Sequence, residues 1–111
     1  MAMTGSNLFT GTLDILVLKT VLSGPMHGYA IGRVLRNETE GVLSVEEGAL
    51  YPSLHRLKKR GLLDAEWART ETGRRAKFYR LTAEGRRHLT AETARWNEYS
   101  GAVATILGRA G

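Results

Sequence analysis

Basic side chains are concentrated between residues 55 and 80 of this 111-residue sequence. The segment holds nine Lys or Arg residues and three acidic residues, whereas the net charge of the whole chain is +5. A positive charge confined to one segment is typical of a surface that binds a polyanion such as nucleic acid. A solvated basic face, common in a protein with an isoelectric point near 10.0, is the alternative interpretation. The basic residues are Arg56, Lys58, Lys59, Arg60, Arg69, Arg74, Arg75, Lys77 and Arg80.

Residues of the types that catalyse reactions or bind metals do not occur at the spacings that a catalytic or metal site requires. The chain has no Cys, and its three His residues are scattered over separate parts of the sequence. Ser53 and His55 are two residues apart and would point in different directions on a helix, so they make a poor nucleophile–base pair. Gly28 and Gly32 lack the Lys-Ser/Thr sequence of a phosphate-binding loop. We therefore expect neither an enzyme nor a bound metal or cofactor.

No segment predicts a membrane helix or a secretory signal. The longest apolar stretch, residues 13–22, is interrupted by Asp14, Lys19 and Thr20 and is shorter than the ~20 residues that a membrane helix needs. Residues 1–12 lack a basic start and a small-residue cleavage site after an apolar core. We expect a cytoplasmic protein without a membrane partner.

Three helices are predicted in the first 60 residues. Residues 13–22 are so densely apolar that this helix should be buried on most sides, and Ser23-Gly24-Pro25 should end it. Residues 28–38 form a second helix with an apolar face made by Tyr29, Ile31, Val34 and Leu35. The third helix should begin at residue 47 or 48, because an earlier start would place Pro52 deep in the helix, where it breaks a hydrogen bond.

The third helix has a basic face opposite its apolar stripe. Leu50, Leu54 and Leu57 follow the i, i+4, i+7 spacing of one helical face. At 100° per residue, the opposite face holds Gly48, Pro52, His55, Arg56 and Lys59, with Tyr51 and Lys58 on one flank. This face carries small side chains at its N-terminal end and basic side chains further along. The N-terminal end is therefore suited to approach DNA bases, and the later turns to approach phosphates. Whether Tyr51 packs at the flank or gives its hydroxyl to a phosphate stays open.

Two strands and a long helix complete the chain. Alternating residues over 63–68 and 77–81, with the polar turn 70–74 between them, predict a β-hairpin, and Trp67, Phe78 and Tyr79 are expected in the core. Thr82 should cap a helix over residues 83–107. We therefore predict a mainly α fold with a small β-hairpin: a flexible N-terminus (1–7), a winged helix-turn-helix domain (8–81) and one long C-terminal dimerisation helix (82–111).

The winged helix-turn-helix arrangement predicts the residues that contact double-stranded DNA. The third helix would enter the major groove, and arginines at the hairpin tip would reach phosphates or the minor groove. The predicted DNA-binding residues are Tyr29, Tyr51, Pro52, His55, Arg56, Lys59, Arg69, Arg74, Arg75 and Lys77.

Four pieces of the sequence resemble the PadR family of bacterial transcriptional regulators, over about residues 11–108. They are HGYAI at residues 27–31, GALYPSLHRL at 48–57 followed by GLL at 61–63, the wing GRRAKFYRLT at 73–82, and Gly85 beyond it. The order and spacing of the pieces make the resemblance specific. Glu46 and Glu47 depart from the pattern, since many members carry a small residue or Pro before the Gly, and two acids there could alter site preference.

The resemblance implies a dimeric repressor that grips a palindromic operator through paired wings and recognition helices. It implies that the long C-terminal helix and the first helix, with Leu13 and Leu16, form the dimer interface. The residues agree in part: Leu89, Trp96 and Val103 repeat every seven residues, and Tyr99 and Ile106 make a second seam. Three short helices cannot cover a 25-residue helix this apolar on one side, so we expect a homodimer.

Trp96 is the candidate effector-binding residue. A two-fold axis crossing the long helix at its middle would bring two copies of this indole together, and two facing indoles can hold a flat aromatic molecule. Some family members bind planar aromatic effectors near the dimer interface, which the resemblance extends to this position. The alternative is that the two indoles fill the interface themselves.

Two other functions remain as alternatives to a regulator that releases its operator on binding an effector. A winged helix can bind protein instead of DNA, but the basic face and wing argue against it here. RNA binding is weaker still, because exposed aromatic residues for base stacking are scarce.

Overall fold

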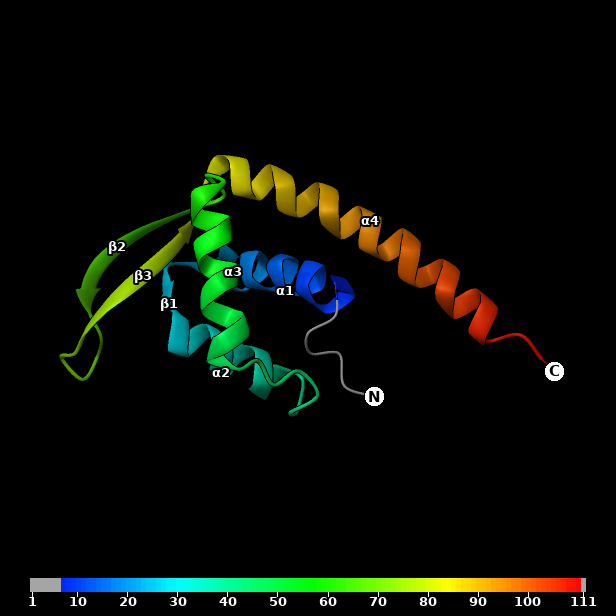
Figure 1. Ribbon diagram of the computed structural model, residues 1–111, viewed down its shortest axis with the longest axis horizontal. Coiled ribbons are helices and arrows are strands. Elements are labelled where there is room, and N and C mark those ends of the chain that lie inside the picture. The colour runs from blue at the N-terminus through cyan, green and yellow to red at the C-terminus, as the bar shows by residue number, and fades with distance from the viewer. Residues whose placement is uncertain (1–6, 111) are drawn as a thin grey trace.

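Helices dominate the computed structural model, which describes residues 7–110, and a small antiparallel sheet joins them (Figure 1). Residues 1–6 of the predicted N-terminal segment lie outside the described residues, while Asn7 already belongs to the first helix. In chain order the elements are α1 (Asn7–Thr20), the 3₁₀ turn η1 (Val21–Ser23), β1 (Met26–His27), α2 (Gly28–Glu38), α3 (Glu47–Lys59), β2 (Leu63–Arg69), β3 (Arg75–Leu81) and α4 (Ala83–Leu107).

The first helix packs into the core from Leu13 onward. Leu13, Val17 and Leu18 are buried, but Ile15 and Leu16 are only partly covered. Of residues 13–22 only Lys19 is exposed, so the prediction that this segment is buried on most sides is confirmed. The predicted stop is confirmed: Gly24 has a φ of 153°, a conformation that essentially only glycine adopts.

The second and third helices begin at sites that the local sequence favours. The Nδ1 atom of His27 accepts a hydrogen bond from the Ala30 backbone N–H at 3.3 Å, which caps the start of α2. α3 begins at Glu47, and Pro52 lies in its second turn, four residues after Gly48. Tyr29 is 65% exposed, so its predicted place on the apolar face of α2 is wrong.

The sheet has the strand order β1-β3-β2, and its β2–β3 hairpin extends beyond the helices (Figure 1). Leu63 and Tyr79 are buried at its base, whereas Trp67 is 57% exposed further out. The prediction that Trp67 lies in the core is wrong, because the β2–β3 hairpin extends beyond the helices that would have to cover this residue (Figure 1). β1 was not predicted; its two residues pair with Tyr79 and Phe78 of β3.

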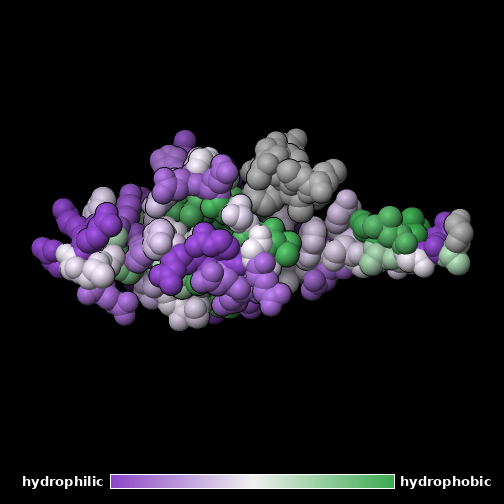
Figure 2. All heavy atoms as spheres, turned by 90° about the horizontal axis from the view of Figure 1, so that it is seen from below, coloured by the Kyte–Doolittle hydropathy of each residue, from purple (hydrophilic) through white to green (hydrophobic). Residues whose placement is uncertain are grey.

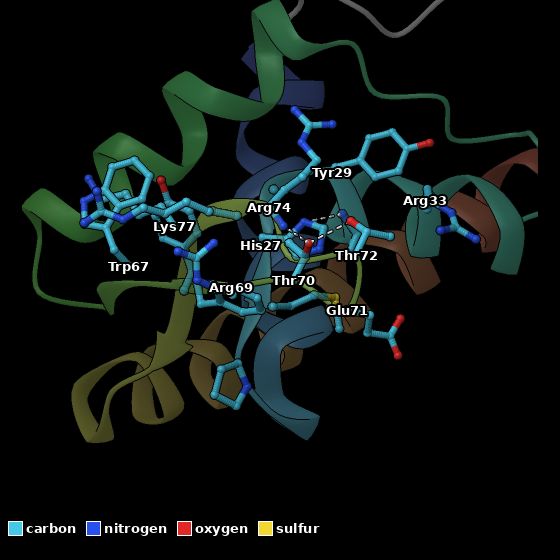
Figure 3. A pocket seen from close by; sticks show the side chains of 18 of the residues that line it. His27, Tyr29, Arg33, Trp67, Arg69, Thr70, Glu71, Thr72, Arg74 and Lys77 are labelled. Carbon is cyan, nitrogen blue, oxygen red and sulfur yellow. Dashed lines mark hydrogen bonds between the residues drawn. The ribbon is translucent and has the colours of Figure 1, made fainter.

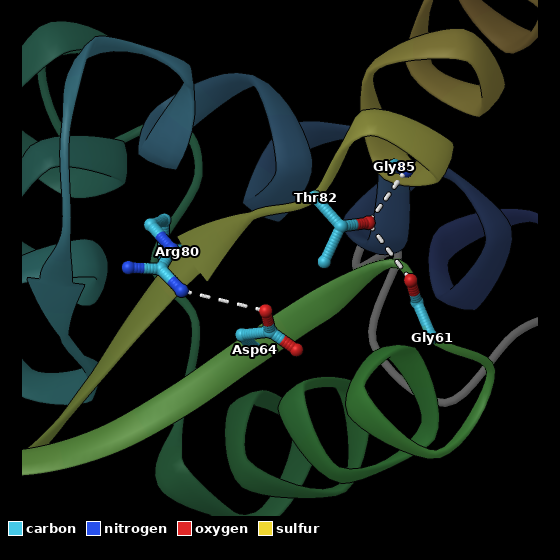
Figure 4. A network of polar contacts seen from close by, with 5 residues as sticks. All are labelled: Gly61, Asp64, Arg80, Thr82 and Gly85. Carbon is cyan, nitrogen blue, oxygen red and sulfur yellow. Dashed lines mark hydrogen bonds and ion pairs between the residues drawn. The ribbon is translucent and has the colours of Figure 1, made fainter.

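A polar junction connects the end of α3, the base of the hairpin and the start of α4 (Figure 4). The Thr82 hydroxyl donates to the Gly61 carbonyl at 2.8 Å and accepts from the Gly85 N–H at 2.9 Å, which confirms the predicted cap. Arg80 and Asp64 pair across the two strands nearby, with 3.4 Å between Nη2 and Oδ2. These contacts fix the hairpin and α4 relative to α3.

α4 packs on the core over its first turns and then leaves it. Leu89 is buried, whereas nearly every residue from Thr90 onward is exposed. The hairpin and the far half of α4 extend in opposite directions (Figure 1), which gives dimensions of 57 × 28 × 22 Å. Over the described residues, no helix is both long and apolar enough to span a bilayer.

Candidate nucleic-acid interface and the exposed face of α4

The outer face of α3 exposes most of the residues predicted to face DNA. Pro52, His55 and Lys59 are exposed, and Lys58 beside them is exposed as well. Tyr51 is 44% exposed on the flank. This face therefore presents small side chains near the start of α3 and basic ones near its end.

Arg56 differs from its neighbours on this helix. It is partly buried, and its Nη2 atom lies 2.7 Å from Oδ1 of Asp14 on α1. The sequence predicts Arg56 on the exposed basic face; in the structure it lies at the edge of that face, on the flank of α3 that adjoins the buried Ser53 and faces α1, and 40% of its side chain is exposed. Its charge is balanced by a carboxylate of the same chain.

The tip of the hairpin is a structured turn that carries two exposed arginine side chains. The Thr70 N–H donates to the Arg74 carbonyl at 2.7 Å, and Gly73 adopts a φ of 86°. Arg69 donates a hydrogen bond to the Gly73 carbonyl at 2.8 Å, which stabilises the turn. Arg74 and Arg75 are exposed. The turn thus holds these two cations at the outer end of the hairpin.

Trp67 lies between two cations on the neighbouring strand. The guanidinium carbon of Arg75 is 5.0 Å, and the Lys77 ammonium 6.0 Å, from the centre of its ring. The register explains the cluster, because Trp67 is paired with Lys77 and Arg69 with Arg75 on the same face of the sheet. Cations within about 6 Å of an indole face are attracted by its π-electrons. Trp67 therefore attracts two cations of the hairpin to its ring.

A groove of about 1080 Å³ separates the hairpin from the N-terminal ends of α2 and α3. Trp67 and Lys77 lie on one side of it, and Tyr29 and Arg33 on the other (Figure 3). The groove is electropositive, since the charged residues that line it are Arg33, Arg69, Arg74, Arg75 and Lys77 against Glu47 and Glu71. The shape and the charge suit a strand of nucleic acid backbone.

Aromatic side chains form the floor where the groove meets the core. The Tyr51 ring lies against Gly28, where a Cβ atom would be only 2.8 Å from the ring. Burial raises the pKa of Tyr79, and the neighbouring Tyr51 raises it further. His27 and Phe78 pack edge to face, with 5.2 Å between ring centres. Tyr51 thus packs on α2 and lines the groove at the same time.

The far half of α4 exposes an apolar stripe. Trp96, Tyr99, Val103 and Ile106 all lie on it, and the rings of Trp96 and Tyr99 are 6.1 Å apart. Hydrophobic side chains gather near the end of this helix (Figure 2), where Leu107 is exposed as well.

Two of the predicted dimer residues lie elsewhere. Leu13 is 1% and Leu89 6% exposed in the free chain, because each packs into the chain's own core. They are therefore not available to a partner, whereas Leu16 on α1 is only partly covered.

Sequence reasoning missed the role of Asp14, which it treated only as an interruption of an apolar helix. The available signal was the spacing of Ser53 and Arg56, which lie one turn apart beside the leucine stripe of α3. A metal site has no candidate among the described residues, where no group of three or more His, Asp or Glu side chains comes together.

A family model covers most of this chain. Residues 17–91 match the model of the transcriptional regulator PadR-like family. The transcriptional regulator Rv3488 of Mycobacterium tuberculosis (strain ATCC 25618 / H37Rv) is 48% identical over 48 residues, which are 43% of this chain and 44% of that protein.

Solved structures of regulators share the fold. A transcriptional regulator from Clostridium thermocellum, Cth-833, has a TM-score of 0.81 at 27% identity and covers 94% of this chain and 100% of its own. A PadR family transcriptional regulator from Eggerthella lenta DSM 2243 has a TM-score of 0.77 at 34% identity, with 93% and 88% covered. Members of this family regulate transcription and are not enzymes. The chain therefore belongs to the PadR-like family of winged-helix transcriptional regulators.

Proposed function

We propose that this regulator binds a palindromic operator as a homodimer in the cytoplasm, represses transcription there, and releases the operator when a small aromatic effector binds. The observation that carries the proposal is the electropositive groove between the hairpin and the N-terminal ends of α2 and α3. A duplex lying across both elements would place its phosphates against the cations of the groove. Residues 8–81 would form the DNA-binding domain, and residues 82–111 the dimerisation helix.

The proposed DNA contacts come from α3 and the hairpin. Pro52, His55 and Lys59 would face the major groove, because the outer side of α3 exposes them. The remaining contacts, from the flank of α3, the start of α2 and the hairpin, would be Tyr29, Tyr51, Arg69, Arg74, Arg75 and Lys77. Arg69 braces the turn through the Gly73 carbonyl and would contact DNA with the guanidinium nitrogens that this bond leaves free.

The proposed dimer buries the apolar stripe of α4. Trp96, Tyr99, Val103 and Ile106 are exposed although they are apolar or aromatic, and a second copy of the same helix would cover them. Leu16 on α1 would add to this interface. A dimer would place two recognition helices about one DNA turn, ~34–36 Å, or a multiple apart, which requires an inverted repeat.

The proposed effector site is at Trp96, where the two-fold axis would bring two indoles together. A planar aromatic molecule would stack between them. If the indoles fill the space themselves, no cavity forms and the repressor acts without an effector. Trp96 already lies close to Tyr99 of its own chain, so a second aromatic surface is present for a ligand to contact.

A selection of fragments from genomic DNA tests this proposal. We expect the protein to recover fragments that share one inverted repeat, and planar aromatic compounds to quench Trp96 fluorescence in a Trp67→Phe variant and to weaken operator binding. Recovery of no common sequence would contradict the operator-binding function and would favour a winged helix that binds protein.

A further inference from the structure

Asp14 of α1 accepts two hydrogen bonds from α3 through a single carboxylate oxygen. Its Oδ1 atom is 2.6 Å from the Ser53 hydroxyl and 2.7 Å from Nη2 of Arg56. The Ser53 side chain is fully buried, and the side chains of Asp14 and Arg56 are 17% and 40% exposed. The cluster therefore lies at the rim of the core, where the two helices meet.

These hydrogen bonds fix the relative orientation of α1 and α3, whose interface is otherwise largely apolar. Leu13 and Val17 of α1 share the core with Leu54 and Leu57 of α3, and apolar packing resists separation more than it resists rotation or sliding. Hydrogen bonds that involve a charged group hold a fixed geometry. Because its two donors lie one turn apart on α3, a single acceptor sets both the rotation and the axial position of that helix.

The pairing also changes what Arg56 can contribute to DNA binding. Its charge is already compensated by Asp14 at 2.7 Å. Moving the guanidinium to a DNA phosphate would leave a carboxylate that is mostly buried without its cation, which is unfavourable. Lys59, almost one turn further along α3, is exposed and offers its charge to solvent.

We propose that Asp14 is a positioning residue for the recognition helix, and that Arg56 orients α3 instead of contacting DNA. This inference rests on the proposed function, because it specifies which residues of α3 contact the operator. It also connects α1, which contributes to the proposed dimer interface, to the helix that reads DNA.

The salt dependence of DNA binding separates a phosphate contact from a positioning role. Each phosphate that a protein cation neutralises contributes about 0.9 to the slope of log affinity against log salt. We expect Lys59→Gln to lower the slope by about 0.9, and Arg56→Gln to leave it unchanged, on a short duplex of random sequence. The two variants remove one charge each from the same helix, so Lys59→Gln is the matched control.

The preference for operator over random duplex measures the positioning role. We expect Asp14→Asn and Arg56→Gln each to lower this preference about tenfold, because each removes one charge of the ion pair and so weakens its charge-assisted hydrogen bond. The double variant should lose about tenfold as well, and not about a hundredfold, since both changes break one interaction. Urea unfolding shows whether each variant is folded. If Asp14→Asn does not fold, the salt slope and the operator preference are both measured on Arg56→Gln, whose side chain is half-exposed in the unmodified protein.

Three results would overturn the proposal: a fall in the Arg56→Gln slope equal to that of Lys59→Gln, an unchanged operator preference in the folded variants, or losses that multiply in the double variant. Failure of the unmodified protein to bind any duplex is a different result, since it would overturn the proposed function itself.

Discussion

Gly85 of α4 lies against the backbone of Leu62: a Cβ atom on Gly85 would be 2.1 Å from the Leu62 carbonyl oxygen. That oxygen also accepts the Thr82 N–H at 3.2 Å, so it cannot move aside without breaking the junction between the hairpin and α4. The close approach of the two backbones therefore requires glycine at this position.

We predict that Gly85→Ala lowers the free energy of unfolding by about 2–3 kcal/mol, because the added methyl group must displace backbone. Gly101→Ala is the matched control, since it is also in α4 and has nothing within 4 Å. Alanine should stabilise the helix there by about 0.5–1 kcal/mol. Urea unfolding curves measure both values, and equal effects would show that the approach at Leu62 is not limiting.

The raised pKa of Tyr79 predicts that the free energy of unfolding falls at alkaline pH. Burial and the neighbouring Tyr51 raise its pKa, so the neutral phenol is favoured in the folded state. Its contribution to stability is present in full below the ordinary tyrosine pKa, near 10, and is lost as the pH rises through the higher folded value. The Tyr79→Phe variant should lack this component. A stability difference between the two proteins that does not change above pH ~10 would contradict the assignment.

The apolar stripe of α4 predicts a dimer that a single charge disrupts. Val103→Glu should shift the protein toward monomer, because it would bury a carboxylate in an apolar interface. Ala94→Glu adds the same charge on the opposite side of the exposed part of the helix and should leave the dimer intact. Light scattering at micromolar concentration measures the mass, and an unmodified protein that is monomeric would refute the interface.

Trp67 is predicted to strengthen DNA binding through the cations that it attracts. Trp67→Leu should weaken binding by about twofold to fivefold, since a cation–π contact contributes about 0.5–1 kcal/mol at an exposed site. The salt slope should not change, because no charge is removed. Trp67→Phe retains an aromatic face and should lose less. Fluorescence anisotropy of a labelled duplex gives these affinities, and equal binding by all three proteins would show that the indole does not matter.

Local signals were sufficient to predict the bounds of α2 and α4. Gly24 and Pro25 separate the first helical segment from β1 and α2, and Thr82 offers its hydroxyl to the first turn of α4. In each case the helix boundary depends on side chains within a few residues of it, so the sequence contains the required information.

Periodicity predicted faces but not how far the core covers them. Leu89 and Val103 belong to the same stripe of α4, yet the first is buried in the chain's own core and the second is exposed. Trp67 continues the buried face of β2 beyond the point at which the helices end. Spacing shows that residues share a face, while coverage depends on where other elements stop.

Long-range contacts could not be predicted from local pattern. The Asp14–Arg56 pair joins residues 42 positions apart, and β1 exists only because Met26 and His27 meet β3. Such contacts are decided by how the helices and the sheet pack together, and no short segment encodes that arrangement.

The salt dependence of duplex binding by an Arg74→Ala/Arg75→Ala variant tests most directly whether the groove binds DNA. Both side chains are exposed at the hairpin end of the groove. We expect the log–log slope of the unmodified protein to be steep and to fall by up to about 1.8 in this variant, at about 0.9 for each phosphate that is no longer neutralised. An Arg95→Ala/Arg109→Ala variant, which removes the same charge at or beyond the far half of α4, should retain the original slope. A slope that is insensitive to Arg74 and Arg75, or that falls equally in the two variants, would contradict a DNA-binding groove.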